Sequence, residues 1–154
     1  HYKHEQKFNS TQPFFFRPPQ GESIADICQR VKIVIDTLAR ECDGKNVVVV
    51  CHGHIVRAFR IVLERLSSTE ANDLLSNKTE QCRVPNCSIL HYTRENPVDK
   101  NQGLSTALNW VRMIRPAGGG ELIDDFSLIV RKKYTNEQLL AEAEKNKKTQ
   151  QVVA

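Results

Sequence analysis

Residues 47 to 59 read VVVVCHGHIVRAF, and this stretch decides which fold class we expect. Val47–Cys51 is a short, continuous run of small apolar residues, which is typical of a strand buried on both faces of a parallel sheet. From Ile55 onward, apolar residues recur at helical spacing. The pattern therefore predicts a central strand that leads through a His52-Gly53-His54 turn into a helix.

Helices and further strands are predicted on both sides of this unit. Ser23 with Asp26, and Ser67 with Glu70, have the spacing of helix-capping boxes, and apolar residues at helical spacing follow Ser23. The predicted elements are helices over residues 23–42 and about 68–76, a strand over residues 88–92, and a short strand or edge segment over residues 108–114. Together they indicate an α/β fold.

The length and composition favour one soluble domain. We assign residues 1–134 to that domain and residues 135–154 to a polar C-terminal helix and tail. No apolar run approaches the ~20 residues needed to cross a bilayer. The net charge of +4 is mild, and the basic residues near the C-terminus lack interleaved aromatics, so a solvated tail is favoured over nucleic-acid binding.

The cysteines and histidines indicate no metal site. The chain has five cysteines, without a C-x-x-C pair, which favours neither a disulfide framework nor zinc and suggests a reducing, cytoplasmic compartment. No acidic or third ligand lies at metal-like spacing from His52 and His54. The sequence does not indicate an oligomeric state.

The predicted strand-to-helix turn has the chemistry of an anion site. The helix after a parallel strand presents unpaired N–H groups and the positive end of its dipole. Gly53 lets a ligand approach the backbone, and His52 can donate a hydrogen bond or a proton to an oxygen held there. This combination suits a phosphoryl group better than other common ligands.

Three ordered motifs resemble the histidine phosphatase superfamily, in its phosphoglycerate-mutase-like branch. They are VVVVCHGHIVRAF, the Arg17-Pro-Pro-Gln-Gly-Glu-Ser23 segment and the Pro85-Asn-Cys-Ser-Ile89 segment, within a resemblance that covers roughly residues 14–92. The resemblance implies a three-layer sandwich with a mostly parallel central sheet. The first strand region of that fold has no counterpart here, so we expect the chain to be truncated at its N-terminus, with a degenerate, non-catalytic homologue as the alternative.

The resemblance also implies a mechanism. In this family a histidine of an R-H-G motif attacks phosphorus, and a second histidine and two arginines hold the phosphoryl oxygens. His52 matches the second histidine, but no R-H-G occurs in residues 1–154, and the clamping arginines and the acidic proton donor cannot be assigned. The expected function of the complete protein is hydrolysis of a small-molecule phosphate monoester through a phosphohistidine. A non-catalytic phosphoanion-binding or interaction domain and a phosphoglycerate mutase are the alternatives.

The candidate substrate-binding residues are Arg17, Gly53 and His54, beside His52 as the candidate catalytic residue. Arg17 suits a surface role over neighbouring aromatics as well as contact with a second anionic group of the substrate. His54 is favoured as a structural residue, since residues two apart do not share a helix face. The expected partner is a small phosphorylated molecule, and no metal or organic cofactor is implied.

Overall fold

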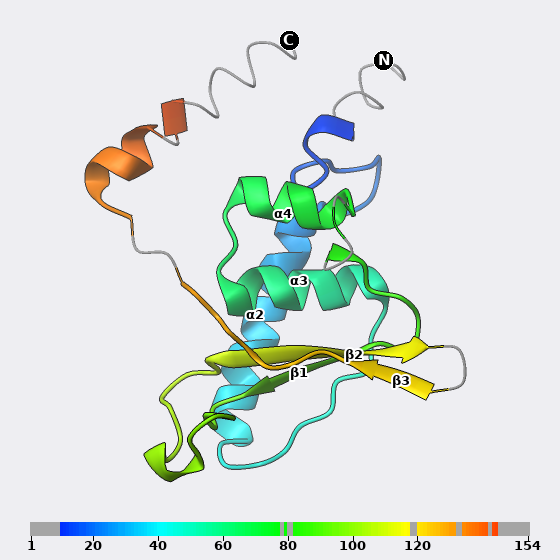
Figure 1. The fold of residues 1–154 in the computed structure, drawn as a ribbon. Helices are drawn as coiled ribbons and strands as arrows, with labels where there is room; N and C mark the ends of the chain where they lie inside the picture. Colours follow the sequence, from blue (N-terminus) through cyan, green and yellow to red (C-terminus); the bar gives the residue numbers. More distant parts are fainter. Residues whose placement is uncertain are drawn as a thin grey trace.

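The computed structural model describes residues 10–77, 79, 82–117, 120–131, 134–141 and 143–144. Three helices, α2 (Ile24–Glu41), α3 (Gly53–Glu64) and α4 (Ser68–Leu75), precede a sheet in the chain. The strands are β1 (Ile89–Thr93), β2 (Trp110–Ala117), β3 (Gly120–Ile123) and β4 (Ser127–Leu128), with a short 3₁₀ helix over Lys100–Gln102. In Figure 1, α3 lies between α4 and the sheet, and α2 crosses behind α3.

The predicted helices are confirmed, and their ends have local causes. Ser23 and Ser67 are the N-caps of α2 and α4, and each forms a complete capping box with the acidic residue three positions later. At the end of α3, Arg65 adopts a left-handed conformation, and its N–H donates to the Ile61 carbonyl. The two capping boxes lie within single turns, which is why residue spacing predicts them.

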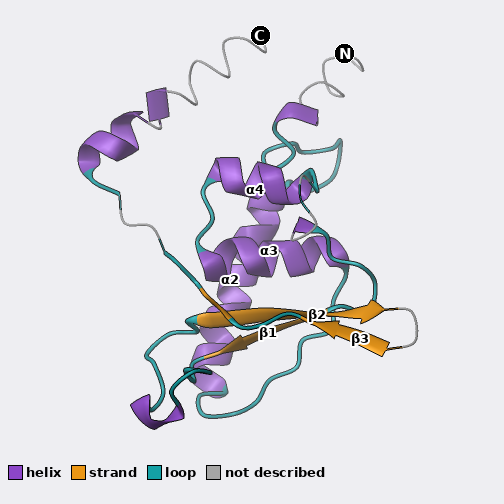
Figure 2. Ribbon diagram, in the orientation of Figure 1, coloured by secondary structure: helices purple, strands orange, loops and turns teal. Residues whose placement is uncertain are grey.

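The sheet differs from the mostly parallel one that we expected. β1 pairs with β2, β2 pairs with β3, and β4 pairs with β2, all antiparallel (Figure 2). Parallel neighbours need a crossover, usually a helix, whereas these strands follow one another without an intervening α-helix. The predicted strand at 88–92 is confirmed as β1, and the edge segment predicted at 108–114 is observed as the longer strand β2.

The prediction of a central strand at Val47–Cys51 is wrong for the described chain. These residues are in no helix or strand, and none of their backbone groups has a hydrogen-bond partner among the described residues. Val48 and Val50 are 88% and 92% exposed. An apolar run favours a buried strand only where other strands pair with it, and no described strand does so.

The core lies where the three helices meet. Ile61 of α3 and Ala71 and Leu74 of α4 are buried together, and partly buried apolar side chains pack around them, among them Phe14 and Ile24. Met113 of β2 is also buried. No helix within the described ranges is long and apolar enough to cross a membrane.

The described part of the C-terminal segment predicted over residues 135–154 is helical, and residues 142 and 145–154 lie outside the described residues. Residues 136–141 and 143–144 are helical, and Thr135 and Gln138 exchange hydrogen bonds at the start of this helix. In Figure 1 the helix stands away from the other helices and the sheet. Leu139 and Leu140 are 52% and 66% exposed, so the helix buries little apolar surface.

Candidate functional site

His52 occupies the N-cap of α3. Its backbone is extended (φ −75°, ψ 157°), and its carbonyl accepts from the N–H groups of Ile55 and Val56 at 2.9 and 3.0 Å. Its imidazole is exposed and makes no capping hydrogen bond, so the ring is free to meet a ligand. This placement confirms that the His-Gly-His turn begins a helix.

The first turn of α3 presents free donors beside this imidazole. The N–H groups of Gly53 and His54 donate to no acceptor among the described residues. A side chain built on Gly53 would meet nothing within 4 Å, so the backbone there is open to an incoming group. Two free N–H groups at the positive end of a 12-residue helix attract an anion.

His54 lies in the first turn of α3 and is exposed. Its imidazole has no hydrogen-bond or ion-pair partner among the described residues. His52, Gly53 and His54 therefore share one helix end.

Arg17 lies on a different segment, the loop that precedes α2. Its Nη2 donates to Asp26 Oδ1 at 2.6 Å, and its side chain is 63% exposed. The Asp26 carboxylate also accepts from the Ser23 hydroxyl and backbone N–H. These hydrogen bonds from Ser23, and then the contact with Arg17, lower the pKa of Asp26. No hydrogen bond or ion pair joins Arg17 to His52 or His54 in the described structure.

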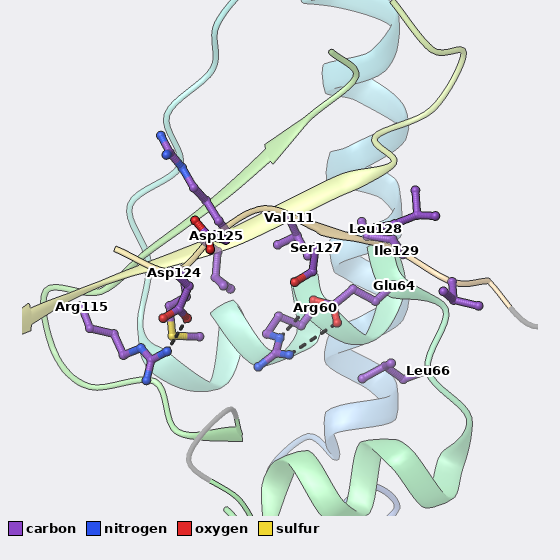
Figure 3. A pocket seen from close by; sticks show the side chains of 14 residues that line it. Arg60, Glu64, Leu66, Val111, Arg115, Asp124, Asp125, Ser127, Leu128 and Ile129 are labelled. Carbon is purple, nitrogen blue, oxygen red and sulfur yellow. Dashed lines mark hydrogen bonds and ion pairs between the residues drawn. The ribbon is translucent and has the colours of Figure 1, made fainter. Parts of the chain in front are cut away.

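A cavity of about 270 Å³ lies elsewhere, between the sheet and the C-terminal half of α3 (Figure 3). Arg60 pairs with Glu64 there at 3.0 Å, and Arg115 pairs with Asp124. Asp125 adds a further carboxylate to the lining. Because the acidic groups oppose the arginines, this cavity is less suited to a phosphate than the open end of α3.

Two asparagines that the sequence analysis did not single out contact the segments around the candidate residues. Asn72 Oδ1 accepts from the Phe14 N–H at 3.0 Å, and Asn77 Oδ1 accepts from Arg57 Nη2 at 2.7 Å. Both contacts join residues more than a dozen positions apart. Residue spacing does not predict these two hydrogen bonds, because they depend on how α4 packs against α3 and against the loop before α2.

The comparison with protein families decides the assignment. The model of the histidine phosphatase superfamily (branch 1) matches residues 1–100. The chain belongs to the histidine phosphatase superfamily. The match includes all three motifs of the predicted resemblance, which is thereby confirmed.

Two curated relatives of this histidine phosphatase family member are 2,3-bisphosphoglycerate-dependent phosphoglycerate mutases. The protein of Methylobacterium radiotolerans is 40% identical over 60 residues, which cover 38% of this chain and 28% of that protein. The protein of Cytophaga hutchinsonii is 42% identical over 52 residues, which cover 32% of this chain and 24% of that protein. The chain thus matches about a quarter of the length of these relatives. No solved structure matches the chain.

Within the described residues, no group of three histidine, cysteine or acidic side chains could hold a metal ion. The five cysteines, Cys28, Cys42, Cys51, Cys82 and Cys87, are all unpaired. Burial raises the pKa of Cys28 to about 11 and raises that of Cys51 as well. Neither thiol is thus favoured as a thiolate nucleophile.

Proposed function

We propose that His52 is the second active-site histidine of a phosphatase that hydrolyses a phosphate monoester of a small molecule through a phosphohistidine. The observation that carries the proposal is the exposed His52 imidazole at the N-cap of a 12-residue helix, beside the open Gly53 backbone. In this role a cationic imidazole and the free N–H groups of Gly53 and His54 stabilise the negative charge of the phosphoryl group in the transition state.

Gly53 and His54 belong to the proposed substrate-binding residues, and Arg17 is proposed to contact a second anionic group of the substrate. The guanidinium of Arg17 is mostly exposed and is held at one side by Asp26, which leaves its other donors available. The attacking histidine does not come from the 154 residues, since they contain no R-H-G motif. In this proposal it comes from sequence that precedes residue 1 in a longer chain.

The compartment is part of the same proposal. Five unpaired cysteines favour a reducing environment, and we propose that the protein works in the cytoplasm. The proposed partner is a small phosphorylated molecule and not a nucleic acid.

The experiment compares two histidine variants in the longer chain that carries the nucleophile. His52→Ala is expected to lower phosphatase turnover of p-nitrophenyl phosphate by about a hundredfold or more, while the circular dichroism spectrum stays unchanged. His91→Ala is the matched control. His91 lies on β1 and not at the start of α3, so this variant is expected to leave turnover unaffected. Near-normal turnover in His52→Ala would defeat the assignment. The 154-residue chain alone is expected to be inactive on the same substrate.

A mutase is the second candidate, because both curated relatives bear that name. The Arg17–Ser23 segment resembles phosphatase members of the family more than dedicated mutases, which favours the hydrolase. Incubating the longer chain with 3-phosphoglycerate and 2,3-bisphosphoglycerate separates the two. Release of inorganic phosphate supports the phosphatase, and conversion to 2-phosphoglycerate without phosphate release supports the mutase.

A non-catalytic phosphoanion-binding domain is the third candidate, and the free N–H groups at the end of α3 support it equally well. It predicts that inorganic phosphate shifts the amide signals of Gly53 and His54 in a ¹⁵N NMR titration, while no chain of any length hydrolyses a phosphate ester. Turnover that depends on His52 contradicts this candidate.

A further inference from the structure

Helix α4 contacts the loop that carries Arg17. The Phe14 N–H, three residues before Arg17, donates to Asn72 Oδ1 on α4 at 3.0 Å. The Phe14 carbonyl accepts from the Ala25 N–H in the first turn of α2 at 3.1 Å. The backbone of Phe14 is thus hydrogen-bonded to α4 through its N–H and to α2 through its carbonyl. The position of the loop depends on α4.

The same helix contacts α3, which begins after His52. Arg57, in the second turn of α3, donates from Nη2 to Asn77 Oδ1 at 2.7 Å. Asn77 lies two residues beyond the end of α4 and has a φ of 50°, a left-handed conformation that asparagine tolerates better than most residues. With this left-handed backbone, the side-chain amide of Asn77 contacts Arg57 on α3.

Apolar packing keeps α4 close to α3 and to the loop that carries Arg17. Ala71 and Leu74 of α4 are buried with Ile61 of α3, and Phe14 packs against the same cluster. Apolar contacts are not directional, whereas hydrogen bonds require defined distances and angles. The packing therefore holds the three segments together, and the two asparagine hydrogen bonds define how they are oriented. In Figure 1, α4 lies directly beside α3 and below the loop that enters α2.

We propose that Asn72 and Asn77 are positioning residues of the phosphate site, which hold the Arg17 loop and the His52 end of α3 in a fixed relation through α4. This inference rests on the proposed function. A substrate with two anionic groups binds more tightly when Arg17 and the His52 end of α3 are held at a constant separation. The reason is that an anchored donor loses less conformational freedom on binding. Neither asparagine touches the substrate in this proposal.

The test measures binding of two probes, inorganic phosphate and pyrophosphate, to the 154-residue chain by ¹⁵N NMR titration of the Gly53 amide. We expect the wild-type chain to bind pyrophosphate more tightly than phosphate, because in the proposed site a second anionic group of the ligand contacts Arg17. Asn72→Ala is expected to reduce this preference by about tenfold, because the proposed charged hydrogen bond from Arg17 to the second phosphoryl group is weakened, and to leave phosphate affinity unchanged. Asn72→Asp keeps an acceptor for the Phe14 N–H and is expected to retain the preference.

Two further variants extend the test to Asn77. Asn77→Gly keeps the left-handed backbone but removes the acceptor of Arg57, and it is expected to lower the pyrophosphate preference as Asn72→Ala does. Asn109→Ala is the matched control. It removes a comparable hydrogen bond, from Arg131 Nη1 to Asn109 Oδ1 at 2.8 Å, away from α4, and it is expected to leave the preference intact.

The double variant Arg17→Ala with Asn72→Ala shows whether Asn72 acts through Arg17. If it does, Asn72→Ala has no additional effect on pyrophosphate binding once Arg17 is removed. Equal losses of the pyrophosphate preference in Asn72→Ala and Asn109→Ala would overturn the inference. An unchanged preference in Asn72→Ala would do the same. In both cases the proposed phosphate site is unaffected. A wild-type chain that binds neither probe would overturn the proposed function, and this inference with it.

Discussion

The hydroxyl of Tyr92 donates to Glu64 Oε1 at 2.7 Å, which joins β1 to the last turn of α3. The same carboxylate oxygen accepts from Arg60 Nε at 3.0 Å, a contact drawn in Figure 3. The side chains of Arg60 and Glu64 are only 16% and 13% exposed. The sheet is therefore fastened to the end of α3 opposite His52 by a largely buried polar network.

Tyr92→Phe is expected to lower the free energy of unfolding by about 1–2 kcal/mol, because it removes one hydrogen bond to a buried carboxylate. Glu64→Ala is expected to lower it by about 3 kcal/mol or more, because it removes the largely buried carboxylate that accepts from both Arg60 and Tyr92. Urea unfolding followed by circular dichroism measures both. Tyr134→Phe is the control, since Tyr134 is 43% exposed, and a cost equal to that of Tyr92→Phe would argue against the network.

Alkaline pH is expected to weaken the fold through Tyr92. Burial, and then the nearby Glu64 carboxylate, raise the pKa of Tyr92 far above its usual value. The unfolded chain loses this proton above about pH 10 while the folded chain keeps it, so stability falls as pH rises, by up to about 1.4 kcal/mol per pH unit. The difference in unfolding free energy between wild type and Tyr92→Phe should shrink from pH 9.5 to 11. A constant difference would contradict the prediction.

Valine-to-threonine exchanges test whether residues 47–51 are buried. Val48→Thr is expected to change the free energy of unfolding by less than about 0.5 kcal/mol, because Val48 is 88% exposed. Val31→Thr makes the same chemical change at a position that is 4% exposed, and it is expected to cost about 1–3 kcal/mol through the buried hydroxyl. Similar costs at both positions would show that Val48 is covered in solution.

The pKa of Asp26, in the first turn of α2, is expected to depend more on Ser23 than on Arg17. The hydrogen bonds from Ser23 are the largest cause of the lowered pKa of Asp26, and the contact with Arg17 contributes less. Ser23→Ala should raise the pKa of Asp26 more than Arg17→Ala does, as measured by ¹³C NMR of the carboxyl group. The lowered pKa stabilises the fold above the usual aspartate range, and this contribution is lost as the pH falls through the folded-state pKa. The opposite order would contradict the assignment.

The sequence alone determined the features that depend on neighbouring residues. The capping boxes at Ser23 and Ser67 and the helix after His52 were all predicted, because a helix is built from contacts three to four residues apart. The composition of β1 also sufficed to place that strand. The family followed from three motifs whose order can be read along the chain.

The tertiary structure decided everything that depends on partners far apart in the chain. Val47–Cys51 has the composition of a central strand, but a strand is completed by hydrogen bonds to other strands, and none of the described strands pairs with it. Only the fold shows that Arg17 pairs with Asp26 and that Asn72 and Asn77 join α4 to its neighbours. Residue types set which contacts are favourable, and packing determines which of them form.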